Sequence, residues 1–154
     1  MICVDASIAI KWLFPEEYSE QALDLIAAAA RARERVIAPH LLPVEVANII
    51  RQRMRVYDLP LDQARLLLAR FFAYRITLRS SPALHDLALN IAANYNLPAV
   101  YDAHYIALAQ QLGCNLWTDD RRLLRSLRGR LPFVKAIADY SAGSITEPAK
   151  GGDS

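Results

Sequence analysis

The sequence is poor in cysteine, glycine and long apolar runs, and each scarcity excludes a class of protein. Its two cysteines, Cys3 and Cys114, lie far apart without the spacing of metal ligands, which excludes a disulfide scaffold and a zinc site. None of its five glycines follows the first apolar run, so the glycine-rich loops that bind dinucleotides and nucleoside triphosphates are absent. The longest unbroken apolar run, residues 25–30, is far shorter than the ~20 residues that cross a bilayer.

The start of the chain and its charge indicate where the protein acts and which ligands suit it. Residues 1–4 are apolar and run directly into Asp5 without a basic leader, so we expect neither secretion nor membrane insertion. The scarcity of cysteine favours a reducing cytoplasm. Net charge is only +2, from 18 basic and 16 acidic residues. Most basic residues are arginines, which suit planar contacts with phosphate or carboxylate, although a GC-rich genome gives the same excess.

The length of the chain, 154 residues, corresponds to one domain. With 54% apolar and 22% charged residues, it has the balance of a globular protein that can bury a core without disulfides or metals. We predict a single domain over residues 1–140. Residues 141–154 contain three glycines and a proline and are predicted to form a flexible C-terminal tail.

Short β-prone runs alternate along the chain with segments of helical periodicity. This alternation predicts an α/β fold with three layers, in which helices cover both faces of a mainly parallel central sheet of about five strands. Ser7 is predicted to cap the first helix. The predicted strands are residues 1–4, 36–38, 75–78, 115–118 and 133–137; the predicted helices are residues 8–13, 16–35, 42–55, 60–72, 82–92, 102–112 and 120–127.

Carboxylates stand where ligands bind in such sheets, beyond the carboxyl ends of the strands. Asp5 directly follows the first strand, and Glu45 enters the helix after the second. Asp119 and Asp120 follow the strand 115–118, and Asp102 begins the helix that precedes it. Any one of these acids is explained by the preference of helix N-termini for negative charge. Together, however, they place an acidic cluster at one edge of the sheet.

Such a cluster predicts a bound cation. Two carboxylates 4 Å apart repel each other by roughly 4 kcal/mol in a protein-like dielectric, which a cation between them offsets. Oxygen ligands without His or Cys favour Mg²⁺ or Mn²⁺, and a divalent ion with open positions supports chemistry on phosphates. Aspartyl-phosphate hydrolases have a second acid two residues after the first, where this chain has Ser7. Phosphoacceptor receivers pair acids at the first strand end, where this chain has one.

The order of these acids resembles that of the PIN-domain nucleases, whose regular acids fall on Asp5, Glu45, Asp102 and Asp120. The strings V-D-A-S-I-A-I-K-W, Y-D-A-H-Y-I-A-L-A-Q-Q-L-G-C and W-T-D-D-R-R-L-L are similar to those of VapC toxins from toxin–antitoxin pairs. The resemblance covers residues 1 to about 140. It implies a PIN-like fold, Mg²⁺- or Mn²⁺-dependent endoribonuclease activity on RNA, a homodimer, and a cognate VapB-like antitoxin that blocks the site.

The resemblance also implies roles for the acids. Asp5 and Asp102 are expected to bind the metal directly, and Glu45 and Asp120 directly or through water. One of these carboxylates is expected to position or deprotonate the attacking water. Asp119 occupies the variable middle position of the T-x-D pattern, which leaves open whether it or Asp120 faces the metal.

Several neighbours are candidates for supporting roles. Ser7 and Thr118 are candidates to hold waters around the metal, or serve only as a helix cap and a strand-end hydroxyl. Asn48 shares a helix face with Glu45 and is a candidate to contact substrate. Arginines that are candidates to contact RNA phosphates, or else lie on solvated helix faces, are Arg51, Arg55, Arg121, Arg125 and Arg128.

The remaining side chains with possible chemistry are interpreted as structural. His104 is two residues from Asp102 and points away from it on a helix, and His40 and His85 have no partner at ligand spacing. Tyr101 and Tyr105 are candidates to stack on a base but favour packing. Two other functions stay open: a PIN-domain RNA-processing nuclease without an antitoxin, and a non-catalytic PIN-like RNA-binding module. Four intact acids argue against the latter.

Overall fold

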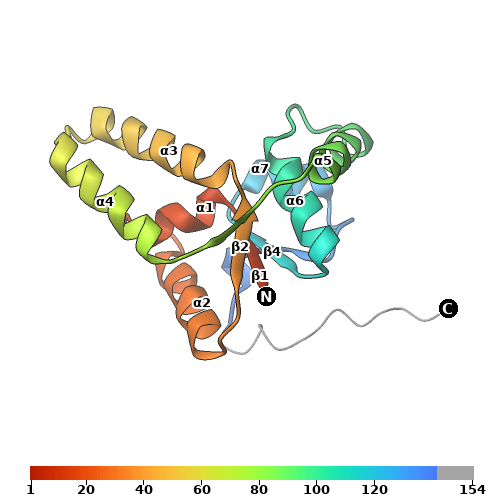
Figure 1. Ribbon diagram of the computed structural model, residues 1–154, viewed down its shortest axis with the longest axis horizontal. Coiled ribbons are helices and arrows are strands. Elements are labelled where there is room, and N and C mark those ends of the chain that lie inside the picture. The colour runs from red at the N-terminus through yellow and green to blue at the C-terminus, as the bar shows by residue number, and fades with distance from the viewer. Residues whose placement is uncertain (142–154) are drawn as a thin grey trace.

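The computed structural model describes residues 1–141, and Figure 1 shows how their strands and helices alternate. Most of the predicted tail, residues 142–154, lies outside the described residues. The elements, with η for a 3-10 helix, are β1 (Ile2–Val4), α1 (Ala6–Ala9), η1 (Ile10–Trp12), α2 (Ser19–Arg31), β2 (Val36–Pro39), α3 (Leu42–Val56), α4 (Leu61–Ala73), β3 (Thr77–Arg79), α5 (Pro82–Asn94), α6 (Tyr101–Leu112), β4 (Asn115–Thr118), α7 (Arg121–Leu127), β5 (Val134–Ala136) and η2 (Ile137–Asp139).

The five strands form one sheet in the order β3-β2-β1-β4-β5, and each pairing between neighbours is parallel. The fold class predicted from the sequence is therefore confirmed. After β1 the chain proceeds to β2 on one side and later returns to β4 on the other, so the strand order reverses beside β1. Such a reversal opens a crevice at the carboxyl ends of the strands, where ligands bind in open parallel sheets.

Helices cover both faces of the sheet (Figure 1). α6 packs against β1, β2 and β4, and α5 packs on α6. On the other face α1 contacts β4, while α3 and α4 form a hairpin that extends outward in Figure 1. Within residues 1–141, no helix is long and apolar enough to cross a membrane.

α6 is the central helix of the fold. Its residues 103–109 are all buried, because alanines alternate with larger side chains and let the helix lie close to the sheet. The helix ends at Gly113, whose φ of +61° is the left-handed C-cap that the sequence predicts. This close packing holds the first turn of α6, which carries Asp102, at the carboxyl edge of the sheet.

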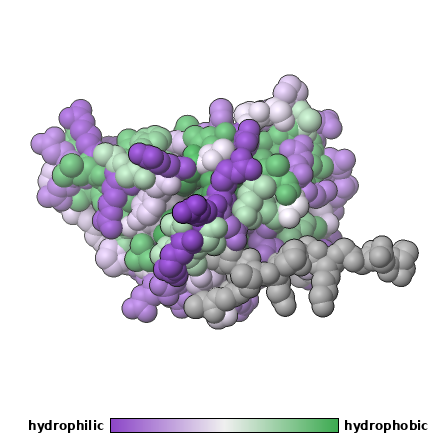
Figure 2. All heavy atoms as spheres, turned by 60° about the horizontal axis from the view of Figure 1, so that its bottom comes forward, coloured by the Kyte–Doolittle hydropathy of each residue, from purple (hydrophilic) through white to green (hydrophobic). Residues whose placement is uncertain are grey.

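The core lies between the sheet and these helices, and the strands β1 and β2 are buried throughout. Exposed large apolar side chains are distributed over several helices. On the face shown in Figure 2, hydrophilic and hydrophobic residues are interspersed.

The N-terminal cap of α1 differs from the prediction. Asp5, not Ser7, is the N-cap, because its Oδ1 accepts a hydrogen bond from the backbone N–H of Ile8 at 3.2 Å. The prediction for Ser7 is wrong because the helix begins at Ala6, directly after Asp5, and not at Ile8. The hydroxyl of Ser7 is then free to bond elsewhere in the crevice.

Candidate active site

The four predicted acids come from four separate elements at the carboxyl edge of the sheet. Asp5 caps α1 after β1, Glu45 lies in the first turn of α3 after β2, Asp102 lies in the first turn of α6, and Asp120 caps α7 after β4. Burial is the main cause that raises the pKa of Asp5, Glu45 and Asp102. In addition, the charge of Asp102 raises the pKa of both Asp5 and Glu45, and the charge of Asp120 raises the pKa of Asp102. The acids therefore lie within electrostatic reach of one another, with Asp102 between the others.

Asp5 is the most buried of these acids, with 6% of its surface exposed. Burial raises its pKa from 3.8 to about 7, against the opposing effect of three hydrogen bonds. The hydroxyl of Ser7 donates to Oδ1 at 2.5 Å, the hydroxyl of Thr118 donates to Oδ2, and the N–H of Ile8 completes the set. A carboxylate so buried and fixed is costly to ionise, so a nearby cation would favour its charged form.

Glu45 is held by a tyrosine from the central helix. The hydroxyl of Tyr105, whose side chain is 1% exposed, donates a hydrogen bond to Oε2 of Glu45. Burial raises the pKa of Glu45, and the Tyr105 bond lowers it again. Burial and the facing carboxylate of Glu45 raise the pKa of Tyr105 well above its usual range, so its hydroxyl stays a donor.

The role of Tyr105 was not predicted, since packing seemed the better interpretation of that residue. A signal was present: Tyr105 follows Asp102 by three residues, which places both on one face of a helix. Sequence alone could not add that Glu45, 60 residues earlier, faces the same side chain.

The two adjacent aspartates, Asp119 and Asp120, have different partners in the structure. Oδ2 of Asp119 forms an ion pair of 2.8 Å with Nζ of Lys11, which is only 4% exposed. Asp120 instead uses Oδ1 to accept the N–H groups of Arg122 and Leu123, at 2.9 and 3.0 Å. The charge of Asp120 also contributes to the raised pKa of Asp102, whereas the carboxylate of Asp119 is paired with Lys11.

Lys11 is a second residue that the sequence analysis missed. Besides Asp119, its ammonium contacts Oε1 of Glu16 at 3.1 Å and the carbonyl oxygen of Glu17 at 2.8 Å. It therefore joins the segment before α2 to the loop after β4. The only sequence signal was a lysine among apolar residues of a predicted helix, where a buried charge needs a partner.

Ser7 and Thr118 connect Asp5 to the loop after β4. Oγ of Ser7 accepts the N–H of Asp119 at 2.7 Å, and Oγ1 of Thr118 accepts the N–H of Asp120 at 3.0 Å. Each hydroxyl thus donates to Asp5 and accepts from the backbone. Two strand ends are in this way joined through one carboxylate.

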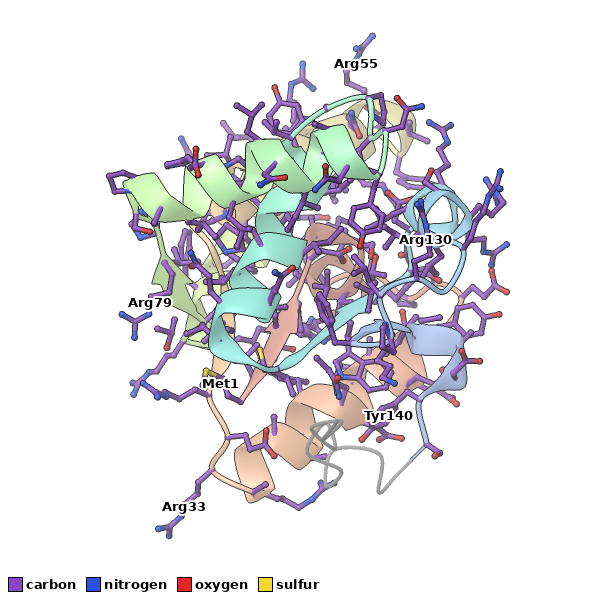
Figure 3. The ribbon with its side chains drawn as sticks, turned by 90° about the vertical axis from the view of Figure 1, so that its right-hand side faces the viewer. Met1, Arg33, Arg55, Arg79, Arg130 and Tyr140 are labelled. Atoms are coloured by element: carbon purple, nitrogen blue, oxygen red, sulfur yellow. The ribbon has the colours of Figure 1, made fainter. Side chains whose placement is uncertain are left out.

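The other predicted residues form no hydrogen bond or ion pair with the four acids within residues 1–141. Asn48, Arg51 and Arg55 are exposed on α3, and Figure 3 shows Arg55 extending outward at the top of the molecule. Arg121 forms an ion pair of 2.6 Å with Glu17, a contact that raises its pKa. Arg125 is exposed on α7 and lines a cavity described below.

His85 and His104 form a pair with each other and are not part of the acidic cluster. Nε2 of His104 lies 2.8 Å from Nδ1 of His85, and Nδ1 of His104 lies 2.6 Å from the carbonyl oxygen of Val100. His104 is buried, as its structural interpretation predicts. The contact between α5 and α6 that brings His85 to it was not predicted, because the two residues are 19 apart in sequence.

The chemistry of the acidic cluster fits a hard divalent cation. Its side chains are carboxylates, the ligands that Mg²⁺ and Mn²⁺ prefer. Burial, and to a smaller extent the charge of neighbouring acids, raises the pKa of Asp5, Glu45 and Asp102, and a cation would favour their charged forms. Within residues 1–141, no three His, Cys, Asp or Glu side chains converge on one point. The reason is that Asp5 is turned toward two hydroxyls and Glu45 toward Tyr105.

Comparisons with known proteins agree with this geometry. The PIN domain family matches residues 2–128, a range that contains all four acids. Ribonuclease VapC9 from Mycobacterium tuberculosis is 34% identical over 134 residues, 87% of this chain and 97% of its own length. Ribonuclease VapC3 from Pyrobaculum aerophilum is 33% identical over 125 residues, 79% of this chain and 91% of its own.

A solved structure has the same fold. The crystal structure of PAE2754 from Pyrobaculum aerophilum superposes with a TM-score of 0.61 at 24% identity, covering 89% of this chain and 90% of that one. The family match and the similarity to two VapC ribonucleases over most of both chains show that this chain belongs to the PIN-domain family.

Proposed function

We propose that this protein is a metal-dependent endoribonuclease toxin of the VapC type, which hydrolyses phosphodiester bonds of RNA. The observation that carries the proposal is that four elements each bring a carboxylate to the carboxyl edge of a parallel sheet, where the strand order reverses and the acids lie within electrostatic reach of one another. The curated relatives that match this region are named ribonucleases.

Mg²⁺ or Mn²⁺ is the proposed cofactor. Asp5 and Asp102 would bind it directly, and Glu45 and Asp120 directly or through water. When bound, the cation supplies a Lewis acid that polarises the phosphate and offsets its negative charge. Asp5 contributes from a fixed position, since Ser7 and Thr118 hold both of its oxygens.

Glu45 is the proposed acceptor for the proton of the attacking water. It is only partly buried, and its Oε2 accepts a hydrogen bond from Tyr105 while Oε1 has no hydrogen bond within residues 1–141. Burial raises its pKa above the usual range for a glutamate, which brings it nearer to the pH at which a general base works best. Tyr105 would keep the carboxylate oriented while the proton moves.

The partner proposed for this toxin is a small VapB-like antitoxin, and the protein is proposed to act in the cytoplasm as a homodimer. An enzyme that cuts RNA in its own compartment must be held inactive until it is needed. The negative charge of the four acids would also attract a cationic side chain of such an antitoxin.

The proposal is tested with purified protein freed of any antitoxin. Structured and unstructured RNAs are incubated with Mg²⁺, with Mn²⁺ and with excess chelator, alongside the Asp102→Asn variant. Cleavage that needs the metal and is lost in the variant supports the nuclease. RNA binding by soluble wild type without cleavage would instead indicate the non-catalytic module.

Growth separates the toxin from an RNA-processing nuclease. Expression of the wild type alone should arrest growth, and co-expression of the adjacent small gene should restore it and yield a complex that co-purifies. A metal-dependent nuclease that has no effect on growth when expressed in soluble form would be an RNA-processing enzyme without an antitoxin.

A further inference from the structure

A cavity of about 510 Å³ lies at the opposite end of α7 from Asp120. Its volume is within the range of pockets that hold a small molecule or a single nucleotide. The residues that line it are Tyr95, Asn96, Arg125, Ser126, Arg128 and Arg130. We call this cavity the arginine pocket.

The arginine pocket is strongly basic. Three of its lining residues are arginines and none is acidic. Within residues 1–141, the side chains of Arg125 and Arg128 have no ion pair or hydrogen bond, whereas Arg121 at the other end of the helix is paired with Glu17. Neighbouring unpaired guanidinium groups repel one another, so an anion between them would be favoured.

One wall of the pocket is well fixed. The guanidinium of Arg130 donates to the carbonyl oxygens of Leu127 and Ser126, both at 3.1 Å, and lies over the ring of Tyr95 at 4.7 Å from its centroid. Figure 3 shows Arg130 beside α7, far from Arg33 at the bottom of the molecule. A guanidinium plane held in this way offers a surface on which a base can stack.

Two chain segments join the arginine pocket to the acidic cluster. The α5–α6 connection begins at Tyr95 in the pocket and reaches Asp102 in the cluster, whereas α7 begins at Asp120 in the cluster and brings Arg125 and Arg128 to the pocket. Eight residues of helical rise correspond to about 12 Å. A nucleic-acid strand covers that distance in at most about four nucleotides, because even when stacked in a duplex each nucleotide adds about 3.4 Å.

We propose that the arginine pocket binds an unpaired nucleotide of the substrate RNA through its phosphate, a few nucleotides from the bond that is cut. The inference rests on the proposed function, because the same strand must reach the acidic cluster. RNA is favoured over an acidic peptide since planar guanidinium groups match phosphate in bidentate geometry, and a stacking surface and the amide of Asn96 stand beside them. A concave pocket admits a nucleotide only when it is not paired in a duplex.

The test measures binding of a fluorescent single-stranded RNA of about twelve nucleotides in excess chelator, where the metal-dependent cut does not occur. Arg125→Gln/Arg128→Gln is compared with Arg33→Gln/Arg70→Gln, which removes the same charge from exposed residues on α4 and after α2. The pocket variant is expected to bind at least about tenfold more weakly than the control. The slope of log K against log salt should fall by about 0.7, since the pocket holds one phosphate and each phosphate contact on a single strand contributes about 0.7.

Two results would overturn the inference. The first is an equal loss of affinity in both double variants, or no loss in either, because binding would then depend on total charge alone. The second is a polyglutamate peptide that binds the wild type as tightly as the RNA and loses its affinity in the same variant. Circular dichroism of both variants shows whether they are folded; if Arg128→Gln disturbs the end of α7, Arg125→Gln alone is tested against Arg70→Gln.

A failure of the pocket inference can be distinguished from a failure of the proposed nuclease function. If the wild type cleaves no RNA with Mg²⁺ or Mn²⁺, the proposed function falls, while binding in chelator still reports on the pocket. If the wild type cleaves and the inference is right, the pocket variant raises the KM of the twelve-nucleotide RNA far more than that of a dinucleotide. Equal increases for both substrates would overturn it.

Discussion

Replacing Asp5 by asparagine should make the metal-free protein more stable at high pH, although Asp5 is fully hydrogen-bonded. Asparagine keeps the N-cap of α1, because its Oδ1 still accepts from Ile8 and Ser7 as the carboxylate oxygen does. At the other position the amide N–H₂ replaces Oδ2, so Thr118 must change from donor to acceptor. That exchange costs about 1 kcal/mol, independent of pH.

The gain comes from removing a buried charge. Folding raises the pKa of Asp5 from 3.8 to about 7, so the native state holds more protons than the unfolded state between these values. The free energy of unfolding of wild type is therefore highest below the unfolded pKa and falls as pH rises. Well above pH 7 the full cost is about 4 kcal/mol, and between pH 5.5 and 8.5 the loss is about 2 kcal/mol. Asparagine does not titrate and has no such loss.

The measurement is urea denaturation of wild type and Asp5→Asn in chelator at several pH values from 5.5 to 8.5. Comparing the two proteins cancels the titration of the other groups that they share. The free energy of unfolding of the variant minus that of wild type should increase by about 2 kcal/mol over this range. A difference that stays constant, or that decreases as pH rises, would show that the buried charge of Asp5 does not oppose folding.

Three further variants test other contacts of the cluster. Without metal, Asp102→Asn should melt at the same temperature as wild type or higher, because it removes repulsion; millimolar Mg²⁺ should then stabilise wild type only. Tyr105→Phe should move the acidic limb of the pH–activity profile to higher pH, because the hydrogen bond from Tyr105 lowers the pKa of Glu45 and its removal raises that pKa. An unchanged limb would exclude Glu45 as the base. Lys11→Met should cost about 3 kcal/mol in urea denaturation, and Lys11→Met/Asp119→Asn should recover part of it, whereas additive losses would contradict a direct pair.

Most of the fold follows from local patterns in the sequence. The strands are short β-prone runs and the helices have clear apolar periodicity, so their order alone indicates a parallel sheet covered by helices. The cap of α1 shows the limit of this reasoning. Asp5 and Ser7 are both good N-cap residues, and the choice depends on whether the helix begins at Ala6 or at Ile8, which the sequence does not reveal.

The positions of the acids were predictable because the carboxyl ends of neighbouring parallel strands share an edge. The contacts that orient them were not, because they join residues distant in sequence. Tyr105 reaches Glu45 across 60 residues, and Lys11 reaches Asp119 across more than 100. Sequence indicates which side chains are chemically able to bond, whereas packing decides which of them meet.

The same reasoning explains why the choice between Asp119 and Asp120 stayed open. Both follow β4, and a one-residue difference in a turn exchanges the directions of their side chains. In the structure the backbone N–H groups of this pair are held by Ser7 and Thr118, which fixes the turn. Lys11 then takes the carboxylate of Asp119.

These contacts together give Asp5 two roles. As the N-cap of α1 and the acceptor for two hydroxyls, it fixes the turn that presents Asp120. As a buried carboxylate, it carries a charge that its surroundings do not neutralise, and its pKa rises accordingly. If Asp5 were needed only for structure, asparagine could take its place and would avoid the cost of a buried charge. The presence of an acid where asparagine would also cap α1 therefore supports the proposal that Asp5 binds a cation as well as shaping the turn.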